Sequence, residues 1–221
     1  MGYAAPPSSV FQREAPKNLQ LTIDDGPDPV PSALTPILKE IATRNVVGAF
    51  FVIGSEVVGR HSAIAQIRAA GHVIGNHSWD HLEPDTGAYS DAAVYEQFAR
   101  THAEVKTAGY EMQHWRAPRL QHIERLNSLI SSLKIKPPWR PIYRLTHCDS
   151  NADSKDSAKD GSGITAAQQI ANIEADIRKQ PGKQNFRLLF HVVPHTAVAL
   201  KEVLDQLVGR GHKLVDFTQS E

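Results

Sequence analysis

The segment Leu21-Thr-Ile-Asp-Asp-Gly-Pro27 joins a strand-like run to a turn that carries two adjacent carboxylates, Asp24 and Asp25. Neighbouring side chains of a strand point to opposite faces, but a sharp turn at its end can bring both carboxylates into one pocket. Two carboxylates that close repel each other unless a cation neutralises one of them. The segment therefore indicates one metal ligand beside one general base, although a solvated turn explains Asp-Gly-Pro equally well.

The rest of the chain repeats a strand followed by a helix about seven times. We expect strands over 18–23, 46–53, 72–75, 114–116, 143–148, 186–192 and 213–217, helices over 33–44, 56–70, 90–108, 123–133, 166–179 and 197–209, and a polar loop over 150–163. Such alternation predicts parallel strands with helices outside them, as a barrel or as an open doubly wound sheet. Residues 1–17 are rich in Pro, Ser and Ala, so we expect a flexible tail followed by a single domain over 18–221.

Composition excludes several classes of function. The 221 residues carry 24 basic and 24 acidic side chains, so the formal net charge is zero. This balance argues against a nucleic-acid partner and against electrostatic docking to a membrane. No apolar run approaches the length of a membrane span, the first ten residues do not resemble a signal peptide, and the single cysteine, Cys148, excludes an intrachain disulfide.

Two histidines, His77 and His81, stand four residues apart in the segment Asn-His-Ser-Trp-Asp-His. On a helical turn this spacing projects both imidazoles to one side, which suits metal binding. The chain has 11 histidines, so accidental pairs are expected, and His191 with His195 is another such pair. The spacing alone therefore leaves two unrelated histidines as an alternative.

The candidate chemical residues share one position in the predicted fold. All fall at or just after the carboxyl ends of expected strands, where (β/α) barrels carry their active sites: Asp24, Asp25, His77, Arg116, Asp149 and His191. One Asp and two His form a three-ligand set that serves Zn²⁺ hydrolases and also Fe(II) oxygenases. The alternating α/β pattern disfavours the strand-rich jelly roll expected of the oxygenases.

Four segments occur in the order seen in polysaccharide deacetylases: LTIDDGPDP at 21–29, NHSWDH at 76–81, WRAP at 115–118 and LLFH at 188–191. The chain thus resembles this family, also known as the NodB-homology family or carbohydrate esterase family 4, over about residues 18 to 217. The resemblance implies a distorted, incomplete (β/α)7–8 barrel that forms one catalytic domain.

The resemblance implies roles for individual residues. Asp24 matches the catalytic base, and Arg116 matches the arginine that orients it. Asp25, His77 and His81 match the metal ligands, commonly for Zn²⁺, with Co²⁺ or Mn²⁺ able to substitute.

The remaining matches concern the acid and the substrate. His191 matches the general acid that protonates the leaving group, and Leu189 matches the residue that lines the acetyl-methyl pocket. The backbone N–H of Arg119 is expected to help bind the oxyanion. Trp79 is a further candidate for substrate contact because it lies inside the histidine motif.

Three departures from the family pattern concern the groove. The third motif usually continues Arg-Pro-Pro-Tyr, whereas here Arg119 ends it, and His191 is normally followed by Asp rather than Val. The fourth motif usually places an Asp and a Trp near the arginine. Here we expect Asp149 to pair with Arg116, with Asp153 as the alternative, and Asp156 to face solvent.

The resemblance implies a metal-dependent hydrolase that removes acetyl groups from an oligo- or polysaccharide and releases acetate. N-acetyl groups of chitin oligosaccharides or peptidoglycan glycans are the first expectation, and the O-acetyl groups of acetyl-xylan or small esters are an alternative. A non-catalytic carbohydrate-binding relative is an alternative of another class, but it predicts loss of the base or acid, and Asp24 and His191 are both present. The family resemblance favours a secreted or cell-envelope location.

Overall fold

A computed structural model describes residues 15–27, 33–82, 89–131, 146–157 and 164–218. The expected tail lies outside these residues except for its last three. Of those three, Lys17 is buried, and its backbone N–H donates to Nδ1 of His212 at 3.1 Å. The last residue of the expected tail is therefore packed against the domain.

The strands of the described residues form one sheet in which every pairing is parallel. They are β1 (Asn18–Gly26), β2 (Ala49–Val52), β3 (Val73–Asn76), β4 (His114–Trp115), β5 (Thr146–His147), β6 (Ala152–Asp153), β7 (Asn185–His191) and β8 (Lys213–Leu214). The order β5-β4-β3-β2-β1-β7-β6 has two free ends in the described part of the chain. The predicted incomplete barrel of parallel strands is thus confirmed.

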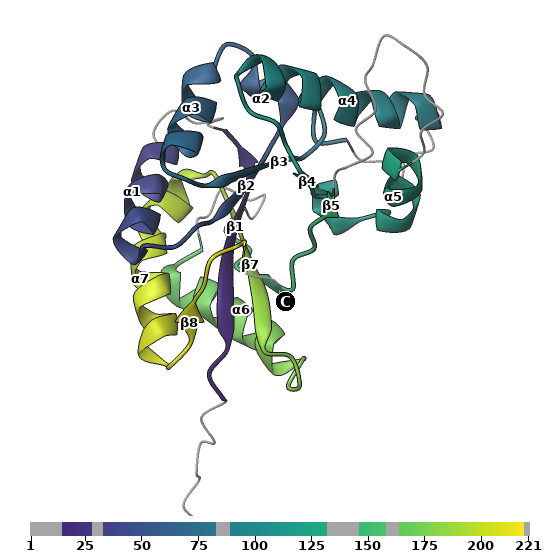
Figure 1. Ribbon diagram of the computed structural model, residues 1–221. Helices are drawn as coiled ribbons and strands as arrows, with labels where there is room; N and C mark the ends of the chain where they lie inside the picture. Colours follow the sequence, from purple (N-terminus) through teal and green to yellow (C-terminus); the bar gives the residue numbers. More distant parts are fainter. Residues whose placement is uncertain (1–14, 28–32, 83–88, 132–145, 158–163, 219–221) are drawn as a thin grey trace, which may run out of the picture.

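Helices lie around the outside of the curled sheet (Figure 1). They are α1 (Leu34–Arg44), α2 (Gly54–Val57), α3 (His61–Ala69), α4 (Asp91–Thr107), α5 (Ile123–Ser131), α6 (Ala166–Arg178) and α7 (Pro194–Gly209). Their apolar faces pack on the strands in one core, and none of the helices in the described ranges combines the length and apolar composition that a membrane crossing needs.

Strand β1 is the centre of the sheet. It pairs with β7 along one edge, from Asn18 to Asp24. Its other edge is shared, because β8 pairs with its first two residues and β2 with its second half. Leu19, Leu21 and Ile23 alternate onto one face of β1 and are 0 to 1% exposed, and the polar Gln20 and Thr22 between them are buried as well, at 3% and 0%. The buried strand therefore carries its terminal carboxylates to a fixed place at the carboxyl edge of the sheet.

Three local expectations were wrong. The helix expected over 56–70 is interrupted between α2 and α3, where Gly59 adopts a left-handed φ of 74°. Helix α7 begins at Pro194 rather than at 197, because proline is tolerated in the first helical turn. The expected polar loop contains β6, which is anchored because Asn151 exchanges hydrogen bonds with the backbone of Arg187.

Candidate active site

A cavity of about 550 Å³ opens at the carboxyl ends of the strands. It is lined by Asp24, Asp25, His77, His81, Arg119, Leu120, Asp153, Lys155, Ser157, Leu189 and His191. Both carboxylates of the opening motif reach this cavity because the register of β1 shifts between Ile23 and Gly26, and Asp25 has a left-handed φ of 63°.

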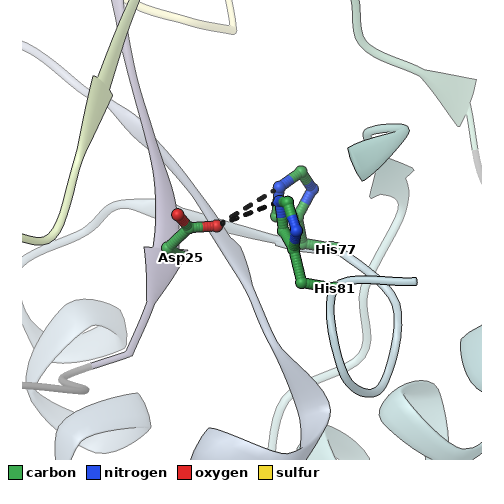
Figure 2. A group of neighbouring side chains, drawn as sticks. All are labelled: Asp25, His77 and His81. Atoms are coloured by element: carbon green, nitrogen blue, oxygen red, sulfur yellow. Dashed lines mark ion pairs between the residues drawn. The ribbon is translucent and has the colours of Figure 1, made fainter. Parts of the chain in front are cut away.

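Asp25, His77 and His81 converge at one side of the cavity (Figure 2). Nε2 of His77 lies 3.5 Å from Oδ1 of Asp25, and Nε2 of His81 lies 3.6 Å from the same oxygen. That oxygen is buried and has no hydrogen-bond partner among the described residues. One carboxylate and two imidazoles within 4.8 Å of one another suit a divalent cation, which would satisfy the buried oxygen.

The histidine pair does not lie on a helical turn, contrary to our expectation. Residues 77–82 form an irregular bend in which Ser78 and His81 have left-handed φ values of 67° and 58°. Non-glycine residues adopt this region at a cost, so other contacts must hold the bend. The two rings still meet, with centroids 5.1 Å apart.

The two imidazoles differ in their surroundings. The ring of His77 is 2% exposed, and its Nδ1 lies 3.1 Å from the carbonyl oxygen of Arg116. The carbonyl requires a proton on Nδ1, which leaves Nε2 free to ligate. Burial, followed by the neighbouring His77, lowers the pKa of His81. A lowered pKa favours the neutral imidazole, which is the form that binds metals.

Arg116 lies behind the cavity and is fully buried. Its Nη1 donates to Oδ1 of Asp24 at 2.7 Å and to the Thr22 hydroxyl at 2.8 Å. Its Nε and Nη2 donate to the carbonyls of Cys148 and Asp149 at 3.0 and 3.1 Å, and Nη2 also contacts the Cys148 sulfur at 3.6 Å. All five guanidinium N–H groups thus have acceptors, and one carboxylate balances the buried charge.

The expected pairing of Arg116 with Asp149 is therefore wrong in its atoms. Asp149 contributes its backbone carbonyl, while its exposed carboxylate accepts from the N–H of Ser150 at 2.9 Å. Asp153 does not pair with Arg116 either and lies instead on the cavity wall. The side-chain partner of Arg116 is Asp24, the proposed base that the resemblance expected this arginine to orient.

His191 is held by a residue that we expected to face solvent. Asp156 is only 2% exposed, and its Oδ1 lies 2.6 Å from Nδ1 of His191. Its Oδ2 accepts from the N–H of His191 at 2.8 Å and from the buried hydroxyl of Thr196. Burial alone would lower the pKa of His191, but the hydrogen bond and charge of Asp156 outweigh it and raise the pKa to about 9.

Three predicted substrate contacts have different outcomes. Leu189 and Arg119 line the cavity. Trp79 does not belong to the lining, because its ring packs against Arg100 of α4, with the guanidinium carbon 3.9 Å from the ring centroid. The residue before it, Ser78, is left-handed, and the indole faces α4.

Three lining residues were not anticipated as part of the site, namely Leu120, Lys155 and Ser157, whereas Asp153 was expected there only as an alternative partner of Arg116. Leu120 follows Arg119 in a turn, and its φ of 55° is left-handed. The other three belong to the short strand β6 or follow it. Ser157 stands closest to the chemistry, with its hydroxyl 3.4 Å from Nε2 of His191. These three residues lie at the cavity because β6 pairs with β7. A strand of two residues is too short to show an alternating pattern in the sequence, so this pairing could not be predicted.

Comparisons with known proteins agree with this geometry. The family model for polysaccharide deacetylase matches residues 12–138. Peptidoglycan-N-acetylglucosamine deacetylase PgdA of Listeria monocytogenes is 38% identical over 105 residues, which are 45% of this chain and 22% of PgdA. The match therefore spans less than a quarter of that relative's length.

Two solved structures share the fold. A family 4 acetyl xylan esterase from Clostridium thermocellum, in complex with a cobalt ion, is 25% identical with a TM-score of 0.70, covering 91% of this chain and 89% of the esterase. A family 4 pseudoenzyme from Bacillus anthracis is 18% identical with a TM-score of 0.74, covering 92% of this chain and 64% of the pseudoenzyme. Since the family model spans more than half of the sequence, this chain belongs to the polysaccharide deacetylase family.

Proposed function

We propose that this protein is a metal-dependent carbohydrate deacetylase that hydrolyses acetyl groups and releases acetate. The observation that carries the proposal is the meeting of three units in one cavity. These are a carboxylate fixed by a buried arginine, an Asp/His₂ cluster, and a histidine paired with a buried carboxylate.

Asp24 is proposed as the general base. Arg116 occupies its Oδ1, so Oδ2 is the oxygen left for a water molecule. That oxygen lies 3.5 Å from Nε2 of His77, which places it beside the Asp/His₂ cluster. A base held in one orientation by a buried ion pair removes the proton from the attacking water without first having to reorganise.

Asp25, His77 and His81 are proposed to hold a divalent cation, Zn²⁺ first, with Co²⁺ or Mn²⁺ as substitutes. When bound, the cation supplies a Lewis acid that polarises the acetyl carbonyl and lowers the pKa of water. The donor set of one carboxylate and two neutral imidazoles leaves positions open, as a catalytic site requires.

His191 is proposed as the general acid. Its Nδ1 is engaged by Asp156, so Nε2 is the nitrogen that faces the cavity and can donate. Water attacks the acetyl carbon, the carbon–nitrogen or carbon–oxygen bond breaks, and the proton on Nε2 passes to the departing sugar atom. A pKa near 9 keeps this imidazole protonated at neutral pH, before the leaving group departs.

The substrate proposed first is an N-acetylated glycan such as a chitin oligosaccharide or a peptidoglycan fragment. The relative named peptidoglycan-N-acetylglucosamine deacetylase supports this choice. O-acetylated xylan is the second candidate, since the acetyl xylan esterase shares the fold at 25% identity. Leu189 would contact the acetyl methyl group, and the backbone N–H of Arg119 would contact the oxyanion.

The test is acetate release from chito-oligosaccharides, peptidoglycan fragments and acetyl-xylan, with and without a chelator. Asp24→Asn should lower the rate by about 10²- to 10⁴-fold at unchanged metal content, because it removes the base and keeps the shape. Near-normal activity of the variant would exclude Asp24 as the base. Absence of acetate release from every substrate by metal-loaded protein would favour a non-catalytic binding protein.

A further inference from the structure

The bend that carries the two histidine ligands has no secondary structure of its own, and the neighbouring helices α2 and α4 help to hold it. Residues 77–82 belong to neither helix nor strand, and two of them are left-handed. Gly54 and Ser55 at the start of α2 donate to the carbonyls of Ser78 and Trp79 at 2.9 and 2.8 Å. These two bonds satisfy one side of the bend.

Side chains hold the rest of the bend: Asn76 Oδ1 accepts from the N–H of Ser78 at 3.0 Å, and Ser78 Oγ accepts from the N–H of Leu82 at 3.2 Å. Gln97 makes the bonds between these two. Oε1 of Gln97, on α4, accepts from the backbone N–H groups of Trp79 and Asp80 at 3.0 and 3.1 Å. Its Nε2 donates to Oδ2 of Asp80 at 3.1 Å. The Gln97 amide thus makes three hydrogen bonds to two consecutive residues that lie between His77 and His81.

The two ligands depend on this bend to different degrees. His77 follows directly on β3, and the carbonyl of Arg116 orients its ring. His81 lies in the second half of the bend. Within the described residues no hydrogen bond orients its ring, and its ion-pair partner there is Asp25 at 3.6 Å. The position of His81 is therefore set by the backbone on either side of it, where Gln97 holds Trp79 and Asp80 and Ser78 Oγ holds Leu82.

We propose that Gln97 is a positioning residue of the metal centre, which fixes His81 at its distance from Asp25 and His77. This inference rests on the proposed metal centre. A side chain that orients a ligand without touching the ion typically changes metal affinity by about 10- to 100-fold when it is removed.

The experiment measures Zn²⁺ and Co²⁺ dissociation constants by competition with a chromophoric chelator, together with the visible spectrum of the Co²⁺ form. Gln97→Ala should raise both constants about tenfold or more and alter the Co²⁺ spectrum. Gln66→Ala, on the exposed face of α3, is the matched control and should change neither. Circular dichroism of the metal-free proteins checks that each variant is folded.

A second set of variants exchanges the amide of Gln97 and the carboxylate of Asp80, and this double variant is the charge-swapped pair. It distinguishes a role of Gln97 in positioning His81 from a general loss of protein stability. Gln97→Glu keeps an acceptor for both N–H groups but sets a carboxylate against Asp80, so metal binding should weaken. Adding Asp80→Asn restores a donor at position 80, and binding should return to within about threefold of wild type.

The outcomes distinguish the two proposals. If wild type binds the metals and Gln97→Ala binds them equally well, the role of Gln97 is overturned while the metal centre stands. Failure of the charge-swapped pair to restore binding also overturns it. If wild type itself binds neither metal, the metal centre falls, and the role of Gln97 falls with it.

Discussion

Replacing Asp156 by Asn tests the proposed general acid most directly. The substitution keeps the shape of the side chain and removes the charge that lies 2.6 Å from Nδ1 of His191. The pKa of His191 is about 9 because Asp156 outweighs the effect of burial. Without that charge, burial should bring the pKa of His191 down toward the ordinary value for histidine, about 6.5.

The magnitude follows from these values. A fall of about 2.5 pH units is worth roughly 3.4 kcal/mol in the preference for the imidazolium. At pH 7.5 the protonated share of His191 should drop from nearly all to about a tenth, so kcat/KM should fall about tenfold. Asp24 and Asp25 also raise this pKa, and a bound cation would offset their charges, so both proteins are compared with the same metal loaded.

The assay is the pH dependence of acetate release, with the pKa of His191 followed in parallel by NMR of its ring nitrogens. His191 loses its proton as pH rises, so the alkaline limb of the variant's profile should move to lower pH. The difference in kcat/KM between the variant and wild type should become smaller as pH falls, because His191 is then protonated in both proteins. Asp149→Asn removes an exposed carboxylate that does not touch His191, and it should leave the limb in place. A variant at position 156 whose alkaline limb coincides with that of wild type would refute the assignment.

Two further predictions concern stability. The buried hydroxyl of Thr196 donates to the Asp156 carboxylate, so Thr196→Val should lower the free energy of unfolding by about 2 kcal/mol and Thr196→Ser by less, as urea denaturation would measure. Burial lowers the pKa of His72, whose Nε2 has no partner among the described residues. The unfolded chain therefore binds more protons below pH 6.5, and stability falls as pH drops through that value. His72→Asn should lose less stability than wild type between pH 7.5 and 5, measured by urea denaturation of metal-free protein, and equal losses would contradict this account.

Much of the fold was predictable because its signals are local. The alternation of apolar strands and amphipathic helices depends on neighbours within a few residues, and it predicted parallel strands with helices outside them, as a barrel or an open sheet. The resemblance to the family narrowed this to an incomplete barrel. The residues at strand ends were predictable for the same reason, since topology places those ends at one edge. Asp24 and Asp25 at the end of β1 and His191 at the end of β7 follow from this rule, and Asp24 is in register with His191.

The parts that were missed depend on contacts between distant segments. Asp156 lies in a polar stretch with several other acidic residues. What distinguishes it is its contact with His191, 35 residues later in the chain, and that contact forms only in the folded protein. The direction of Trp79 depends on one left-handed residue, Ser78. Neither property leaves a periodic pattern in the sequence.

The barrel alone does not decide whether this chain is an enzyme, because pseudoenzymes also adopt it. What bears on activity is the arrangement of buried charge. Arg116 and Asp156 are both almost inaccessible to solvent, and each is costly to bury unless a partner of opposite charge is fixed beside it. Their partners are Asp24 and His191, the two groups proposed to move protons. A protein that only bound glycans would gain nothing from keeping both pairs aimed at one cavity, so the pairs favour a hydrolase.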